Sequence, residues 1–126
     1  LITDPSVFTT LAFVSLSITG DRGFSFARKP GADTRLTIDE INKDMLTDTK
    51  IFHVGSLSLT DEPARTATFE SVKIAKDAGA IISYDPNYRA PLWENVDKAM
   101  EMMRLMIQFA DVMKISDEET SLLTPY

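Results

Sequence analysis

The feature that most constrains this fold is the alternation of short apolar segments with longer amphipathic ones. Residues 51–55, 80–85 and 111–115 are short and largely apolar, which predicts buried strands. Segments with helical spacing of apolar residues follow the first two, at about 62–79 and about 95–110. Strands joined by helical crossovers run parallel, with the helices packed on the sheet. The sequence therefore predicts an α/β fold.

A β-hairpin is expected before this alternating region. Residues 9–18 are β-branched and apolar, and residues 24–28 alternate large and small side chains. The intervening residues 19–23 contain turn-forming glycines and Asp, which suits a hairpin connection. Residues 29–33 then end the second strand. The overall prediction is a layered, Rossmann-like fold with a mostly parallel sheet, flanking helices and an N-terminal hairpin.

Two capping boxes mark helix starts. Thr37 with Glu40 predicts a short helix that ends near Thr47, and Ser116 with Glu119 predicts another near the end of the chain. The apolar face of the first helix should hold Ile38, Ile41 and Met45. The apolar stripe of the helix at 95–110 should hold Val96, Met100, Met103 and Ile107, with Ala99, Met106 and Ala110 beside it.

Composition limits the classes of partner and site. The chain has 126 residues, the length of one domain, and a net charge of −6, which would repel nucleic acid and anionic membranes. A few local Arg residues still permit an anionic substrate. It has no cysteine, so no disulfide or thiolate metal site can form, and a reducing compartment such as the cytoplasm fits. No apolar run approaches the roughly 20 residues of a membrane helix.

Polar residues with chemical potential follow the predicted strands. Ligands of parallel sheets bind at the carboxyl ends of the strands. Arg89 could bind a phosphate or carboxylate while Asn87 adds a hydrogen bond, or the loop could be an Asx-type turn with a solvated Arg; the residues favour neither. Glu119 could hold water around Mg²⁺, but capping with Ser116 is favoured. Arg28 could close over a sugar, although a lone Arg at a strand end is usually exposed.

Several segments of the chain carry a resemblance to a known family when they are taken in order. They are 11–14, 26–33, 51–56, 78–80, 83–89, 91–93 and 114–119. The segment from 84 to 93, with Asp-Pro-Asn-Tyr-Arg and Pro-Leu-Trp, is the most specific. Together they resemble fructokinases of the ribokinase-like (PfkB-type) carbohydrate kinase family. The resemblance implies a ribokinase-like fold. It also implies transfer of the γ-phosphoryl group of ATP to a sugar hydroxyl, with Mg²⁺ and an Asp base.

The resemblance assigns roles to five residues. Arg28 matches an Arg that reaches the sugar, and Asn87 and Arg89 match a loop that faces the substrate and the nucleotide phosphates. Ser116 and Glu119 align with the family's N-x-x-E motif, whose Glu organises Mg²⁺ and phosphate through water. Ser116 replaces the Asn of that motif, which puts a phosphate-binding role for Ser116 in doubt.

Two motifs of the family are not found in the sequence. These are the Gly-Gly sugar-binding stretch and the D-T-x-G-A-G-D run that carries the catalytic Asp. The chain also opens without Met and ends soon after a predicted helix begins. Residues 1–126 are therefore expected to be the central portion of a kinase domain, inactive alone and with an apolar sheet face left uncovered. A 2-keto-3-deoxygluconate kinase, or a non-catalytic α/β binding module, stays as an alternative. The oligomeric state is open, a homo-oligomer included.

Overall fold

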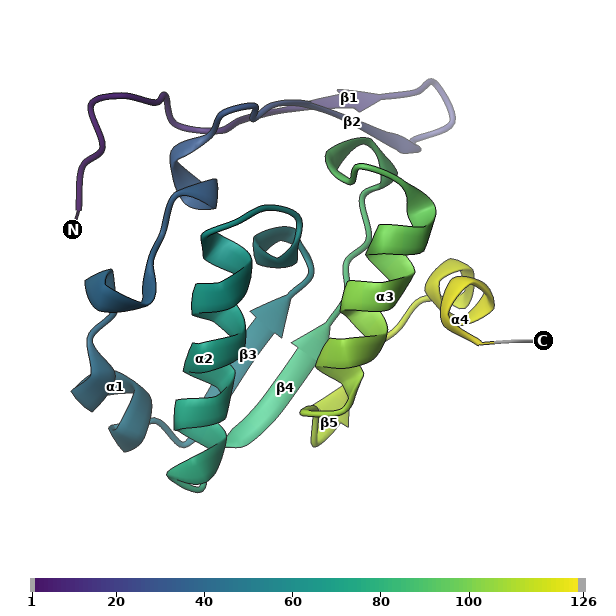
Figure 1. The fold of residues 1–126 in the computed structure, drawn as a ribbon. Helices are drawn as coiled ribbons and strands as arrows, with labels where there is room; N and C mark the ends of the chain where they lie inside the picture. The colour runs from purple at the N-terminus through teal and green to yellow at the C-terminus, as the bar shows by residue number, and fades with distance from the viewer. Residues whose placement is uncertain (1, 125–126) are drawn as a thin grey trace.

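A three-stranded parallel sheet covered by helices on one face forms the body of the chain (Figure 1). The computed structural model describes residues 2–124, so the two ends noted in the sequence lie partly outside it. Strands β3 (Ile51–Gly55), β4 (Ile81–Asp85) and β5 (Val112–Met113) are neighbours in that order. Helices α2 (Ala64–Asp77) and α3 (Val96–Ile107) are the two crossovers, and both lie on the same face. The predicted α/β class and parallel pairing are confirmed.

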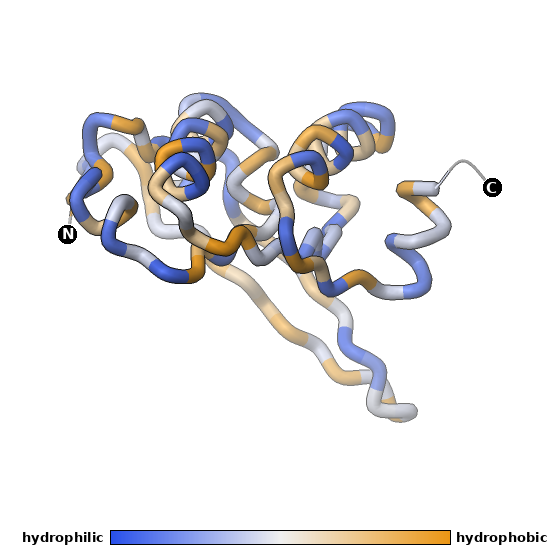
Figure 2. The backbone as a smooth tube through the Cα atoms, turned by 90° about the horizontal axis from the view of Figure 1, so that it is seen from below, coloured by the Kyte–Doolittle hydropathy of each residue, from blue (hydrophilic) through white to orange (hydrophobic). Residues whose placement is uncertain are grey.

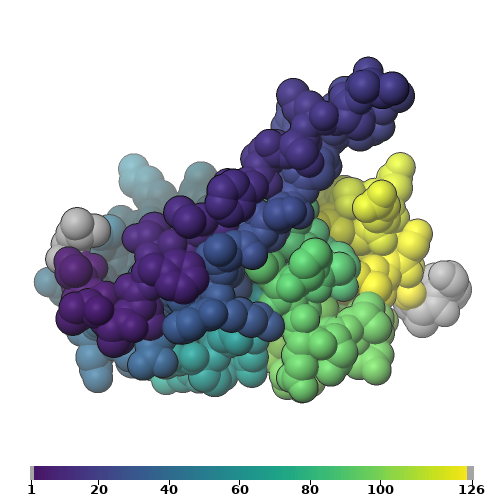
Figure 3. All heavy atoms as spheres, turned by 90° about the horizontal axis from the view of Figure 1, so that it is seen from above, coloured from purple at the N-terminus to yellow at the C-terminus, as the bar shows by residue number. Residues whose placement is uncertain are grey.

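The predicted hairpin is confirmed and extends away from this body. Strands β1 (Leu11–Leu16) and β2 (Arg22–Ala27) pair antiparallel, with Phe13 opposite Ser25. Gly20 adopts a φ of 88° in the connecting turn, a conformation that glycine reaches without steric cost. Figures 2 and 3 show the tip of the hairpin projecting well beyond the helices and the sheet.

The helix predicted from 37 to about 47 is wrong as a single element. Glu40 Oε2 accepts from the Thr37 N–H at 2.8 Å, as predicted, but this box caps only a 3₁₀ turn, Ile38–Glu40. A second N-cap then begins helix α1 (Lys43–Asp48), because Asn42 Oδ1 accepts from the Met45 N–H at 3.2 Å. The restart changes which side faces inward, so Met45 is exposed and Leu46 is buried.

The buried stripe of α3 is shifted from the predicted one: Met103, Ala99 and Met106 are buried as expected, but Met102 replaces Val96. The side chains buried against the sheet are Ala99, Met102, Met103 and Met106. Val96, placed in the stripe from the sequence, is 46% exposed. Both sets have helical spacing, and a run of methionines at 102, 103 and 106 offers two overlapping apolar faces. Contact with the sheet selects the face that is centred on Met103.

The core lies between this helical layer and the inner face of the sheet. Val72 of α2, Ile82 and Tyr84 of β4 and Met103 of α3 are fully buried within it. Gly79 ends the turn after α2 at a φ of 94°, as expected for the residue that follows a helix. The short elements that complete the chain are three 3₁₀ turns, Ala32–Thr34, Leu57–Leu59 and Ala90–Leu92, and helix α4 (Asp117–Leu123).

The outer face of the sheet is not covered by any part of residues 2–124. Ile51 of β3, Ile81 of β4 and Val112 of β5 are 61%, 49% and 59% exposed, respectively. Between them, His53 Nδ1 and Ser83 Oγ lie 3.1 Å apart. Parallel sheets are normally covered on both faces. The apolar face expected from the sequence is therefore present. None of the described helices has the length and apolar character needed to cross a membrane.

We predict that the 126-residue chain self-associates through this outer face. Ile51→Thr should weaken association about tenfold, because one large apolar side chain contributes roughly 1–2 kcal/mol when buried. Met45→Thr is the control, since Met45 is 66% exposed on α1, away from the face. Concentration-dependent light scattering measures the effect. A chain that stays monomeric at high concentration would contradict the prediction.

Candidate functional site

A polar cavity lies where the loops after β3 and β4 meet. The Ser56 N–H donates to the Pro86 carbonyl at 3.1 Å, which joins the two loops. The cavity has a volume of about 330 Å³. The residues that line it are His53, Gly55, Ser56, Leu57, Ser58, Asp85 and Asn87. Its position at the carboxyl ends of parallel strands is where this class of fold binds ligands.

The loop after β4 is an Asx turn. The Asp85 carboxylate accepts from the Asn87 N–H at 3.2 Å, and Asn87 has a φ of 46° in the left-handed region. Lys114 Nζ lies 3.3 Å from the other Asp85 oxygen. The Asx-type turn that the sequence offered as one interpretation of this loop is thus confirmed. It also places Asn87 at the cavity, where the sequence prediction needs it.

Arg89 lies against the hairpin and is not simply solvated. Its Nη1 donates to the Tyr88 carbonyl at 2.9 Å. Its guanidinium carbon lies 4.9 Å from the ring centroid of Phe24 in β2, within the range of a cation–π interaction. Neither interpretation of the sequence included this contact, since residues 24 and 89 are far apart along the chain.

Arg28 is buried, which corrects the expectation of an exposed side chain. Its Nε donates to Asp33 at 2.7 Å, its Nη1 to Thr60 Oγ1 at 2.7 Å, and its Nη2 to the Leu57 carbonyl at 2.7 Å. A second carboxylate, that of Asp61, lies 3.7 Å from Nη1. Two carboxylates and a carbonyl thus offset the desolvation of the guanidinium. Arg28 fastens the base of the hairpin to the turn after β3.

The structure does not place Arg28 in the cavity that Asn87 lines. It borders two other hollows beside the hairpin base, one with Asp61 and Glu62 and one with Phe26 and Pro91. Its link to the strand-end cavity runs through Leu57, which lines that cavity and accepts from Arg28. A direct contact of Arg28 with sugar stays a prediction.

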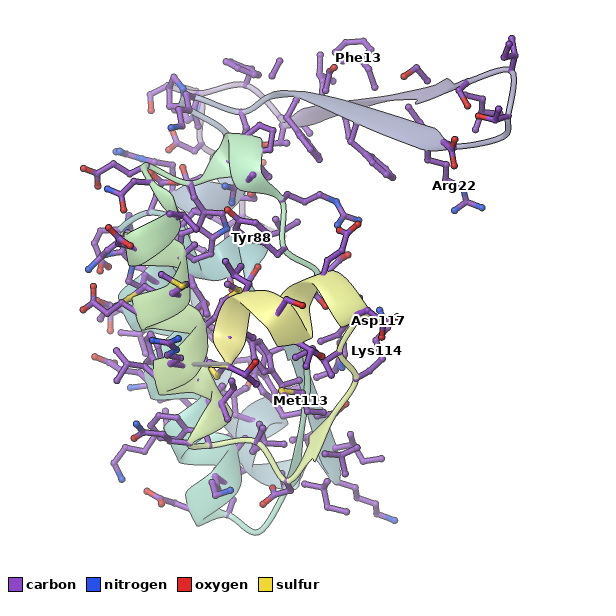
Figure 4. All side chains as sticks on the ribbon, turned by 90° about the vertical axis from the view of Figure 1, so that its right-hand side faces the viewer. Phe13, Arg22, Tyr88, Met113, Lys114 and Asp117 are labelled. Atoms are coloured by element: carbon purple, nitrogen blue, oxygen red, sulfur yellow. The ribbon has the colours of Figure 1, made fainter. Side chains whose placement is uncertain are left out.

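Glu119 is buried and joins α4 to the loop after β4. Its Oε1 accepts from the Tyr88 N–H at 2.7 Å, and its Oε2 accepts from the Ser116 N–H and Oγ, each at 2.9 Å. Figure 4 shows Tyr88 and the start of α4 close together. Burial raises the pKa of Glu119, but the hydrogen bonds from Ser116 and Tyr88 outweigh it and hold the pKa below its usual value. The predicted capping is confirmed.

A metal role for Glu119 stays a prediction. Within residues 2–124 no cluster of three or more His, Cys, Asp or Glu side chains has the geometry to hold a metal ion. Both carboxylate oxygens of Glu119 accept hydrogen bonds, two at Oε2 and one at Oε1. An approach through water, as the resemblance implies, leaves these bonds in place.

Sequence reasoning missed Ser56 as a cavity residue, whereas it placed Asp85 at the strand end as the first residue of the candidate loop. Ser56 is fully buried, and its hydroxyl has no hydrogen-bond partner among the described residues. The signal was available, because Gly55-Ser56 follows a predicted strand directly. By contrast, the bond from Tyr88 to Glu119 joins residues 31 positions apart and has no local signature.

These features define an α/β protein with a cavity, a candidate ligand site, at the carboxyl ends of parallel strands. The family model of pfkB family carbohydrate kinases matches residues 1–125, and the chain belongs to that family. The ribokinase-like fold predicted from the sequence is confirmed, because this chain is similar to solved structures of the family.

Fructokinases are among the curated relatives of this chain. Probable fructokinase-5 from Arabidopsis thaliana is 48% identical over 121 residues, which cover 96% of this chain and 37% of that protein. The chain thus spans little more than a third of the length of the curated relatives it matches.

Solved structures of fructokinases superpose on most of the chain. The fructokinase with bound ATP from Xylella fastidiosa is 37% identical, with a TM-score of 0.79 over 95% of this chain and 38% of that one. The fructokinase from Vibrio cholerae O395 in its fructose-, ADP- and calcium-bound form is 29% identical. Its TM-score is 0.75 over 90% of this chain and 37% of that one.

We predict that Glu119→Gln destabilises the fold by about 2 kcal/mol at neutral pH, since a buried charge-assisted acceptor is lost. The folded pKa of Glu119 is lowered, so its contribution is complete above its unfolded value of 4.5. This contribution is lost as the pH falls through the pKa of Glu119 in the folded state. Wild type and variant should then have nearly equal free energies of unfolding. Urea unfolding across this pH range measures it. Glu118→Gln, at an exposed neighbour, is the control, and an equal loss in both variants would refute the role of Glu119.

Arg28→Ala should cost about 3–5 kcal/mol of stability, because it leaves buried partners of an ion pair uncompensated. Arg35→Ala should cost no more than about 1 kcal/mol, since Arg35 is exposed and lies 3.9 Å from Asp4. Chemical denaturation compares the two variants. Similar losses would show that Arg28 does not support the hairpin base. Lost activity in Arg28→Ala is therefore weak evidence for a sugar contact.

Proposed function

We propose that this chain is the central portion of an ATP-dependent sugar kinase that transfers the γ-phosphoryl group of ATP to a hydroxyl of fructose, giving fructose 6-phosphate. The observation that carries the proposal is the 48% identity to a probable fructokinase over nearly the whole chain. The ATP-bound and fructose-bound fructokinases with the same fold support it.

The chemistry of the strand-end cavity favours a neutral sugar as substrate. Its polar groups come from hydroxyl, amide, imidazole and carboxylate side chains, and no Lys or Arg of the described chain lines it. Such groups exchange hydrogen bonds with sugar hydroxyls. A sugar acid such as 2-keto-3-deoxygluconate would bring its carboxylate toward Asp85, which is unfavourable. Arg89, in the same loop, is the feature that keeps the sugar acid as the alternative.

The phosphate groups of ATP are proposed to bind at the edge of this cavity. Arg89 and Asn87 would bind phosphate oxygens, and Ser116, the N-cap of α4, is proposed to bind phosphate with them. Arg28 and Arg89 are proposed to reach the substrate. Mg²⁺, held through water near Glu119, would neutralise the phosphate charge when bound. Because Glu119 also anchors Tyr88, it would fix the loop that carries Asn87 and Arg89.

Residues 1–126 alone are proposed to be inactive. The Gly-rich run with the catalytic Asp, which the family resemblance implies, is not in this sequence, so no residue here is assigned as the base. Phosphoryl transfer depends on positioning and charge stabilisation from several loops. The chain supplies some of these loops and spans 37% of its fructokinase relatives. A cytoplasmic location stays a prediction.

The test is ADP release by the complete natural gene product that contains this chain, with fructose and with 2-keto-3-deoxygluconate. Arg89→Ala should lower kcat/KM by about 10- to 100-fold, because a charge-assisted hydrogen bond to phosphate is lost. Arg35→Ala, at an exposed Arg beside Asp4, should change it little.

Turnover of fructose alone supports the fructokinase, whereas turnover of the sugar acid alone selects the alternative. A folded gene product that phosphorylates no sugar would refute the kinase proposal and favour a non-catalytic α/β module.

A further inference from the structure

The hairpin meets the body at its base and again midway along β2. At the base, Arg28 binds Thr60 and Asp33, and the Ala32 N–H donates to the Phe8 carbonyl at 2.9 Å. Midway, Phe24 contacts Arg89. Beyond this point the hairpin is exposed, with Leu16 71% accessible (Figure 3). The Phe24 contact is therefore the last point of support that the described body gives the hairpin.

Phe24 lies on the side of the hairpin that faces the body. Side chains of β2 alternate between two faces, so Arg22, Phe24 and Phe26 share one face. Figure 4 shows Arg22 directed toward the body and Phe13, on the opposite face, directed away from it. The rings of Phe24 and Phe26 are stacked, with centroids 6.3 Å apart and planes 10° apart. Phe26 thus holds the ring of Phe24 in one orientation.

Arg89 is fixed at both ends of its side chain. Its backbone follows Tyr88, whose N–H is bound by the buried Glu119 carboxylate. Its guanidinium lies over the Phe24 ring. A cation–π contact does not use the N–H donors of the guanidinium. Nη1 of Arg89 donates to the Tyr88 carbonyl, and the donors on Nε and Nη2 stay available to a phosphate or carboxylate. The contact therefore orders a long side chain without consuming the donors an anion needs.

We propose that Phe24 is a positioning residue, which holds the Arg89 guanidinium in the orientation that binds the transferred phosphoryl group. This rests on the proposed function, in which Arg89 binds that group. The hairpin then contributes to anion affinity through one aromatic ring. Because coupling between binding and conformation is reciprocal, a bound phosphate that keeps Arg89 in place also favours the hairpin position seen here.

The test compares the binding of fructose 6-phosphate with that of fructose by titration calorimetry on the complete gene product. Phe24→Leu should weaken fructose 6-phosphate binding roughly two- to fivefold, the scale of an exposed cation–π contact, and leave fructose binding unchanged. Phe24→Tyr keeps an aromatic face and should retain wild-type affinity. Phe13→Leu is the matched control, because Phe13 is 59% exposed on the opposite face of the same hairpin.

A double-mutant cycle separates positioning from a general effect on the hairpin. In an Arg89→Gln background, Phe24→Leu should cause no further loss. The proposal is overturned if Phe24→Leu behaves like Phe13→Leu, if fructose and fructose 6-phosphate weaken equally, or if the loss persists without Arg89.

Failure of the proposed function has a different signature, because the wild type then neither phosphorylates nor binds fructose. Inorganic phosphate, followed by ³¹P line broadening, tests the role of Phe24 in that case. A loss of phosphate binding in Phe24→Leu but not in Phe13→Leu supports the proposal, and equal binding overturns it.

Discussion

The buried carboxylate of Glu119 is the interaction on which the arrangement of the site depends. A charge with 6% exposure is tolerated only when hydrogen bonds replace its hydration. Here the donors come from two separate elements, Ser116 at the start of α4 and Tyr88 in the loop after β4. The loop that carries Asn87 and Arg89 thereby acquires a fixed position relative to a helix that begins 30 residues later. Without this carboxylate, the loop would keep the Asx turn at Asp85 and the bond from Ser56 to Pro86, but it would lose its link to α4.

Arg28 connects the hairpin to the body of the chain, as Glu119 connects the loop after β4 to α4. Its guanidinium is shared between the hairpin base and the turn that follows β3, so the two strand-end loops and the hairpin form one connected polar network. The network links to the loop after β4 through the bond from Ser56 to Pro86. Buried ion pairs of this kind fix geometry more than they add stability. That property suits a site that must place groups from distant parts of the chain.

The sequence predicted the features that depend on local chemistry. The parallel strands, the glycine turn at Gly79 and the capping box at Ser116 follow from patterns within a few residues, and all are present. The burial of Arg28 and its contacts with Thr60 and Leu57 depend on residues about 30 positions away, which no local pattern reports. The exposure of Met45 has a local cause, because Asn42 is a second capping residue that competes with Thr37.

Charge is distributed in the site in a way that bears on its chemistry. No Lys or Arg of the described chain lines the cavity at the strand ends, whereas Lys114 lies 3.3 Å from the lining residue Asp85 and Arg89 lies over the Phe24 ring. In the proposed reaction, between an uncharged hydroxyl and a highly charged phosphoryl donor, this separation would keep competing anions out of the cavity. Because Phe24 already restricts the Arg89 side chain, an anion that binds Arg89 would cost less side-chain entropy.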